Sequence, residues 1–488
     1  MRLPAFRSDE SSTQGRVGIA PWIVAGAWLI LAFFRRSPHY DEVAVLASAA
    51  MLFGTVWFIG WHPRPDWAPL RIIGFAVYAQ AFLSSGLSVI NANNLGYSMF
   101  TPAPWAFSFA TVSTFVFVSM FVAGVSLTML FLRPRPEEEG DAHLPTWLAW
   151  ALALVASVYT LATNFGVSAI QRLGNAPSIA FKTTLVISLL LATWLVHKRS
   201  MRLPLLVVFG AQTVALLVSS MLGSLLVPAR DVILTYFQLR KPFPWKLAIA
   251  AGAFVLLLNP AKHAVRSELM RDASTNPRGF ATTERAVEAW SDAFEQTWSL
   301  DSSTSTDVER HFQTTLSRLD YNWVSALIYT LVPRALPYEG GRTYEDIPLF
   351  LIPRVVYPDK PTSQDYFRTR WTTRLGVQTW ESAKYTSIAI PACAEAYWNF
   401  GWAGVFIVPL VVGLAVGGII YLAPSSTVGR AAYMVVVATG LTGFLDMLVW
   451  LVPQFFIVAI TAFLLRLYLR PGRVAPGQPM AVGRARLS

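Results

Sequence analysis

Long apolar runs recur along this chain, and they constrain its fold more than any other feature. A helix needs about 20 predominantly apolar residues to cross the hydrocarbon core of a bilayer. Runs near that length lie at 17–34, 43–61, 70–90, 105–132, 145–163, 183–197, 203–222, 224–239, 246–260, 402–423, 431–450 and 452–468. With 54% hydrophobic and only 14% charged residues, the chain resembles polytopic membrane proteins rather than soluble domains. We therefore expect an all-α, polytopic membrane bundle of about twelve transmembrane helices.

The stretch 203–240 decides the orientation of everything after it. If it formed one span, the downstream topology would be reversed, whereas two spans turned around GSLLVPARD (223–231) agree with the charge distribution. With both termini inside, the inside segments carry nineteen Lys and Arg, and the short outside segments carry five, namely Arg35, Arg36, Arg172, Lys182 and Arg230. Cytoplasmic loops carry the excess of Lys and Arg. We expect an inner-membrane protein with both termini in the cytoplasm.

This topology divides the chain into four segments. They are a transmembrane bundle of about nine spans (1–260), a large extracytoplasmic loop (261–390), the C-terminal spans (391–470) and a basic cytoplasmic tail (471–488). The tail can lie beside anionic lipid and accounts for much of the net charge of +11, so nucleic acid is a poor candidate partner. The single cysteine, Cys393, excludes an internal disulfide, and six scattered histidines show no paired metal-ligand spacing. We expect no metal and no cofactor.

The large loop has three parts. Residues 283–298 show helical spacing of Val287, Trp290, Phe294 and Trp298, which predicts an amphipathic helix on the outer membrane face or capping the loop. Residues 308–332 also have helical spacing, and their apolar second half can form a re-entrant element. From residue 333 onward, repeated prolines and glycines predict an extended, rigid strip rather than a helix.

Basic residues gather in and after this strip. They are Arg334, Arg342, Arg354, Lys360, Arg368, Arg370 and Arg374. Arginine presents a planar fork that matches phosphate oxygens, and lysine adds a point charge, so Arg342, Arg354 and Lys360 are candidates for binding a diphosphate. The alternative is that these groups pair with nearby acidic residues on a solvated surface.

Two further groups of polar residues lie at the predicted outer ends of spans. Arg230, Asp231 and Asp446 are ionisable groups at membrane depth, which usually face a cavity or a partner; a purely structural Arg–Asp pair is the alternative. Glu395 and Asn399 are four residues apart and share a helical face at the start of the tenth span. Glu395 can accept a proton from an attacking hydroxyl, although an aromatic membrane anchor with a solvated Glu explains this stretch equally well.

Two quoted segments carry a resemblance to a family. GGRTYEDIPLFLIPRVVYPDKP (340–361) in a large outer loop, followed by AEAYWNFGWAG (394–404) at the next span, resembles the oligosaccharide repeat-unit polymerases of the Wzy type. The resemblance covers roughly 203–423, and it also extends to the related O-antigen ligases. It implies a GT-C-like, metal-independent integral-membrane glycosyltransferase that takes its donor glycan from undecaprenyl diphosphate at the outer membrane face.

The resemblance also implies site roles. The donor diphosphate would lie against Arg230, Arg342, Arg354 and Lys360, with Glu395 and Asp446 as candidate bases and with Asn399 and Arg318 positioning the substrate. The implied partners are an undecaprenyl-diphosphate-linked oligosaccharide, membrane lipid, a chain-length regulator and a flippase. Two alternatives stay open: an O-antigen ligase-like transferase, which a mutant with full-length chains on its lipid carrier would indicate, and a transporter or flippase, which would move lipid-linked glycan without forming glycosidic bonds.

Overall fold

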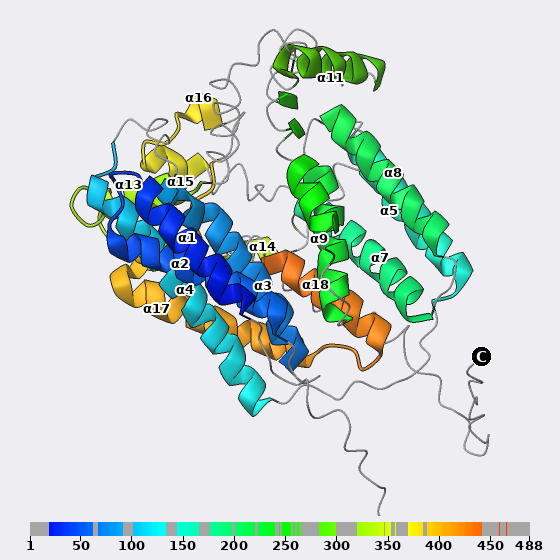
Figure 1. Cartoon of the computed structure of the whole chain (residues 1–488), viewed down its shortest axis with the longest axis horizontal. Helices are drawn as coiled ribbons and strands as arrows, with labels where there is room; N and C mark the ends of the chain where they lie inside the picture. Colours follow the sequence, from blue (N-terminus) through cyan, green and yellow to red (C-terminus); the bar gives the residue numbers. More distant parts are fainter. Residues whose placement is uncertain are drawn as a thin grey trace, which may run out of the picture.

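In the described part of the chain, every regular element is a helix. The computed structural model describes residues 19–61, 67–90, 101–132, 144–164, 176–197, 201–219, 223–239, 246–254, 283–298, 320–345, 347–352, 369–383 and 388–441, with isolated positions at 244, 257–258, 261–262, 265, 357, 458 and 465. Its helices are α1 (Ala20–Arg35), α2 (Glu42–Gly60), α3 (Ala68–Ala81), η2 (Phe82–Gly86), η3 (Leu87–Ile90), α4 (Pro104–Phe131), α5 (Thr146–Asn164), α7 (Ala176–His197), α8 (Arg202–Ser219), α9 (Gly223–Gln238), α11 (Thr283–Trp298), α13 (Asn322–Leu331), α14 (Ile347–Leu351), α15 (Thr369–Arg374), α16 (Trp380–Ala383), α17 (Ala392–Tyr421) and α18 (Thr427–Leu441). Figure 1 shows the long helices gathered in one bundle.

Among the described residues, four segments are long and apolar enough to cross a membrane: α2, the α3–η2–η3 segment, α4 and α17. Shorter apolar helices lie in α1, α5, α7, α8 and α18. Large apolar side chains are well exposed on the outside of this bundle, including Phe34, Phe131 and Val155. Exposed apolar area on this scale is unusual for a soluble monomer. The helices therefore indicate a membrane-embedded, helical protein.

The two helices expected between residues 203 and 240 are confirmed as α8 and α9, which pack side by side. Their expected turn at GSLLVPARD was wrong, because α8 ends at Ser219 and α9 already begins at Gly223. Pro228 lies inside α9, and apolar helices in membrane proteins tolerate such prolines. Arg230 and Asp231 consequently lie within α9 and not in a turn.

One end of the bundle gathers the segments that surround the candidate site. The turn between α1 and α2 meets the end of η3 through a hydrogen bond from the Ser37 N–H to the Val89 carbonyl. The start of α4 meets α13 there, because the Ala103 N–H donates to the Thr330 hydroxyl. Figure 1 shows α15 and α16 close to α13, on the same side of the bundle. The large loop between α9 and α17 therefore returns to this end.

Helices α4 and α17 form the closest packing in the core. A Cβ added at Gly124 of α4 would lie 2.4 Å from the Leu410 carbonyl oxygen, and one added at Gly413 of α17 would lie 2.2 Å from the Phe121 carbonyl oxygen. Small residues allow such backbone contact between apolar helices, where dispersion replaces the hydrophobic effect as the main attraction. These glycines fix α17 against α4, and so fix the position of its first residues.

α17 is broken at Phe400 and Gly401, where Gly401 adopts φ +61°. Every residue from Ala392 to Asn399 is buried, whereas the part after Gly401 exposes apolar side chains such as Ile407 and Val411. The sequence placed the tenth span at about 402 and residues 392–404 at its entrance, and the helix break agrees with that division.

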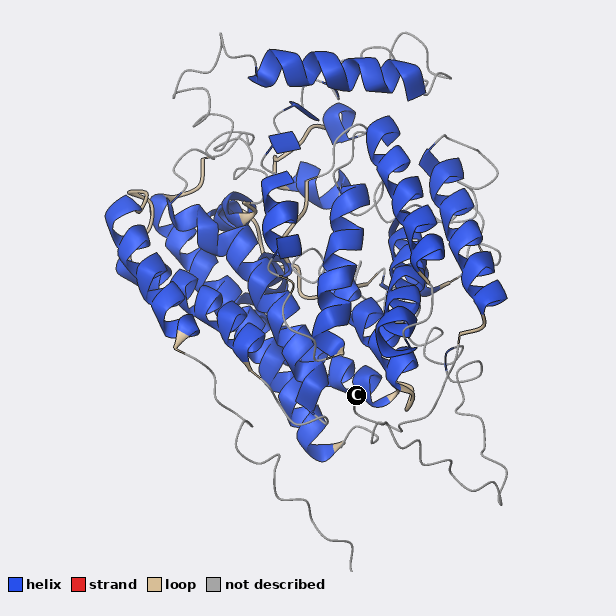
Figure 2. Cartoon of the chain, turned by 45° about the vertical axis from the view of Figure 1, so that its right-hand side comes forward, coloured by secondary structure: helices blue, strands red, loops and turns tan. Residues whose placement is uncertain are grey.

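The large loop was predicted in part. The amphipathic helix over 283–298 is confirmed as α11, and Figure 2 shows it lying crosswise over one end of the bundle. The segment from 333 to 345 contains no helix, as expected, but Ile347–Leu351 forms α14, so a fully extended strip was wrong there. Proline at the second position of α14 is compatible with a first helical turn. Residues 353–356 and 358–361 of the strip lie outside the described residues.

Candidate functional site

The first buried turns of α17 hold the loop 339–344 through one side chain, that of Asn399. Its Oδ1 accepts from the Gly341 N–H at 2.9 Å, and its Nδ2 donates to the Thr343 hydroxyl at 2.7 Å and to the Glu395 carbonyl at 2.9 Å. Two further backbone bonds join the Glu339 and Gly340 N–H groups to the carbonyls of Trp398 and Asn399. Asn399 is 1% exposed. Its role here is to hold the loop that carries Arg342.

A buried carboxylate, that of Glu339, draws two arginines together. The Arg374 guanidinium lies 2.6 Å from Glu339 Oε1, and the Arg342 guanidinium lies 4.0 Å from Oε2. The Glu339 side chain is 1% exposed, whereas the side chains of Arg374 and Arg342 are 35% and 62% exposed. A carboxylate with this burial is normally retained only with cationic partners. Glu339 therefore forms a close ion pair with Arg374 and a longer one with Arg342, and both arginine side chains stay partly exposed.

A tryptophan of α15, Trp371, contacts Arg374 and a further arginine, Arg370. The guanidinium carbons of Arg370 and Arg374 lie 5.0 and 5.7 Å from the Trp371 ring centroid. The Trp371 ring is fully buried and meets the Trp398 ring edge to face at 5.3 Å. Cation–π contacts of this kind hold a guanidinium over a ring. Arg342, Arg370 and Arg374 thus share one surface, which we call the arginine surface, with Glu339 as its buried counter-ion.

Glu395 lies beneath this loop and is 0% exposed. Burial raises the pKa of the neighbouring Tyr344 hydroxyl well above its usual range, and the Glu395 carboxyl raises that pKa further, while Asn399 lowers it. Tyr344 therefore remains protonated at neutral pH. Glu395 is thus a fully buried carboxyl within electrostatic reach of Tyr344, and it does not face solvent.

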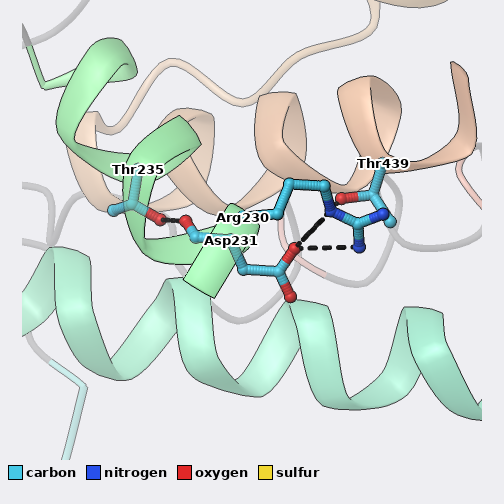
Figure 3. Close-up of polar contacts among 4 residues, drawn as sticks. All are labelled: Arg230, Asp231, Thr235 and Thr439. Atoms are coloured by element: carbon cyan, nitrogen blue, oxygen red, sulfur yellow. Dashed lines mark hydrogen bonds and ion pairs between the residues drawn. The ribbon is translucent and has the colours of Figure 1, made fainter. Parts of the chain in front are cut away.

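Arg230 is paired within α9. Its Nε and Nη2 both donate to Asp231 Oδ1, at 3.2 and 3.1 Å, and the Thr439 hydroxyl of α18 donates to the same oxygen at 3.2 Å (Figure 3). Asp231 is 0% exposed, and the Arg230 side chain is 26% exposed. An Arg–Asp pair is thus present, but it lies within α9 and does not itself join two spans, whereas the hydrogen bond from Thr439 to Asp231 joins α18 to α9. Asp446, the other carboxylate considered as counter-ion, lies outside the described residues.

The structure brings together three of the predicted site residues, Arg342, Glu395 and Asn399. Arg230 pairs with Asp231 of its own helix instead, and Arg318, Arg354, Lys360 and Asp446 lie outside the described residues, so their roles stay predictions. The sequence placed Arg374 in the basic cluster and allowed Glu339 as an acidic partner of such arginines, but assigned neither residue to the site. Their ion pair is the pairing that this alternative predicted, although Glu339 is buried and not solvated. Both were visible as charged residues of the loop, but no spacing in the sequence shows that residues 339 and 374 meet.

In the described residues, no three His, Cys, Asp or Glu side chains gather closely enough to hold a metal ion. What the arrangement offers is a fixed group of cations at one end of an apolar bundle. Such a group can bind an anion with several oxygens, and a phosphate or diphosphate has the matching geometry. Comparison with protein-family models, curated proteins and solved structures gave no match for the chain.

Proposed function

We propose that this protein is an integral-membrane polymerase of lipid-linked oligosaccharide repeat units. It would transfer the growing glycan from undecaprenyl diphosphate to a sugar hydroxyl of the next lipid-linked unit, at the outer membrane face. The observation that carries the proposal is the arginine surface, in which a buried Glu339 and the Trp371 ring fix arginines at one end of an apolar helical bundle. The resemblance of residues 340–361 and 394–404 to the polymerases supplies the substrate class.

Transfer of a glycan from a diphosphate needs positively charged groups, and the arginine surface contains them. The bond between the anomeric carbon and the diphosphate oxygen breaks, and a bond from that carbon to the acceptor oxygen forms. The electron pair stays with the leaving diphosphate, and the acceptor proton passes to a base. Cations that are already in place stabilise the developing charge without reorganisation. Arg342 and Arg374 lie against one buried carboxylate, that of Glu339, and Arg370 adds a third guanidinium beside Trp371.

Fewer observations support the identity of the general base. Glu395 and Asp446 are the candidates from the sequence, and Glu395 lies under the loop that carries Arg342. A diphosphate that moved Arg342 outward would also move the loop 339–344, which lies next to Glu395. Asn399 connects these two groups, because its side chain bonds the loop at Gly341 and Thr343 and the helix at Glu395.

The test begins with the surface glycan. In a strain with no second polymerase, deletion of the gene should replace the ladder of long chains on a gel by material of one repeat unit. Complementation with Arg374→Ala or Arg342→Ala should restore the protein to the membrane but leave the chains short. Arg36→Ala is the matched control, since Arg36 lies near the same end of the bundle and pairs with Glu42 away from the arginine surface.

Two outcomes would contradict the proposal. An unchanged ladder after deletion would exclude a polymerase. Full-length chains that accumulate on the lipid carrier would show that the protein transfers finished chains to another acceptor, as an O-antigen ligase does. If Arg36→Ala shortens the chains as strongly as Arg374→Ala, the arginine surface has no special role.

A further inference from the structure

A second candidate site lies beside α11, apart from the arginine surface. An open cavity of about 640 Å³ is bounded by α8, by the helical residues 254 and 258, and by α11. Its apolar lining comes from Phe254, Leu258, Val287, Trp290 and Phe294. Ligand pockets typically measure about 300–1,000 Å³ and are mostly apolar with a few polar groups. This cavity fits that description and shares no residue with the arginine surface.

An apolar stripe leads along α8 to the cavity. Leu203 and Leu206 are 60% and 64% exposed, Gly210 follows on the same face, and Thr213 lines the cavity itself. A Cβ at Gly210 would meet nothing within 4 Å, and the same holds for Gly252 of the neighbouring helical segment. Ten residues of helix from Leu203 to Thr213 span about 15 Å, which is half of a ~30 Å hydrocarbon core. The stripe is therefore as long as one leaflet of a bilayer.

The position of α11 places this cavity at a membrane surface. Ala289, Trp290 and Ala293 pack onto Ala261 and Val265, and α11 contacts α8 (Figure 1). The helix lies crosswise over the bundle, as amphipathic helices lie in the interface plane (Figure 2). Val287 and Phe294 are still 49% and 38% exposed, toward the cavity that they line. The junction between the apolar stripe of α8 and α11 therefore has room for an apolar ligand.

The charge at the cavity mouth determines which kind of lipid head group can bind there. Glu295 lines the cavity, and Glu288 and Asp292 are exposed on the same helix, which carries only one basic residue. A head group with a net negative charge would be repelled there, whereas an ammonium group would pair with Glu295. We propose that this cavity binds a zwitterionic phospholipid with a primary ammonium head group, phosphatidylethanolamine. One acyl chain follows the α8 stripe, and the ammonium contacts Glu295.

The experiment uses the full chain in mild detergent, mixed with dioleoyl phosphatidylethanolamine or dioleoyl phosphatidylglycerol, and native mass spectrometry counts the adducts. The wild-type protein should retain the ethanolamine lipid about tenfold better than the glycerol lipid, which corresponds to ~1.4 kcal/mol. Glu295→Gln should remove most of that preference. Ser291→Phe, which fills the cavity from an exposed position, should reduce retention of both lipids. Glu42→Gln, which removes a carboxylate of α2 that does not line the cavity, should behave as wild type.

Equal retention of the two lipids by the wild-type protein would overturn the head-group assignment. Undiminished retention by Ser291→Phe, with an unchanged melting temperature to show that the variant is folded, would overturn the cavity as the site. If undecaprenyl phosphate displaces the phospholipid at a lower concentration than that of the phospholipid, the cavity is a site for the polyprenyl chain instead. None of these outcomes depends on the glycan product, so this inference and the proposed function can fail separately.

Discussion

Asn399 offers the sharpest test of how α17 and the loop 339–344 are joined. Its side chain makes three hydrogen bonds, to Gly341, Thr343 and Glu395, and it is 1% exposed. Asn399→Ala would leave the Gly341 N–H without its acceptor, at about 1–3 kcal/mol for a buried group. The Thr343 hydroxyl would lose a further ~1 kcal/mol. The Glu395 carbonyl would lose little, because a helix interior already supplies it with a donor.

These contributions sum to about 2–4 kcal/mol, which is an upper value because Gly341 and Thr343 can partly re-form bonds elsewhere. The chain provides its own reporter, since Cys393 is the only cysteine and is fully buried six residues before Asn399. When opening is fast relative to labelling, the rate at which a maleimide reacts with Cys393 follows the open population. Asn399→Ala should then raise that rate roughly 30- to 700-fold.

The measurement needs a control of similar chemistry. Ser126→Ala removes a hydroxyl that bonds only within α4, to the Val122 carbonyl, and should leave the Cys393 labelling rate unchanged. If Asn399→Ala labels no faster than Ser126→Ala, then the hydrogen bonds of Asn399 do not hold the loop to α17. The account of the arginine surface as a preset structure would lose its support.

Three further substitutions test the remaining contacts. Gly413→Val should lower the melting temperature sharply and reduce the yield of folded protein, because its side chain would meet the Phe121 carbonyl; Gly418→Val, where a Cβ meets nothing within 4 Å, is the matched control. Gly401→Ala should cost about 1–2 kcal/mol from its left-handed backbone, measured as increased Cys393 labelling, and equal labelling would refute the strain. Asp231→Ala should cost about 2–3 kcal/mol by leaving Arg230 without its buried carboxylate, and a melting temperature equal to that of Glu42→Ala would contradict this.

The helices were largely predictable because each apolar run must satisfy its backbone internally. The run at 43–61 became α2, the run at 105–132 became α4, and the amphipathic spacing of 283–298 became α11. Boundaries were less predictable. At 223–231, glycine and proline indicated a turn, yet the apolar residues around Pro228 continue as helix. At 347–351, prolines were read as breakers, although one of them stands where a helix begins.

The candidate site was predictable only in its composition. Clustered arginines and the Glu395–Asn399 spacing identified the region, because both are short-range patterns. The pairing of Glu339 with Arg374 depends on how 35 residues of loop fold back, and local spacing does not encode that distance. The burial of Glu395 was also not predictable from the sequence. Glu395 was expected near solvent at the mouth of a span, but it is 0% exposed and lies within electrostatic reach of Tyr344.

Glycosidic bond formation by the purified protein is the most direct test of the central claim. The full chain would be placed in phosphatidylethanolamine-rich vesicles with undecaprenyl-diphosphate-linked repeat units, and products would be resolved by length. The proposal predicts lipid-linked chains of two and more units, one released undecaprenyl diphosphate per bond, and a large loss of both with Arg374→Ala. Repeat units that stay monomeric but move between leaflets would contradict it and would identify a transporter.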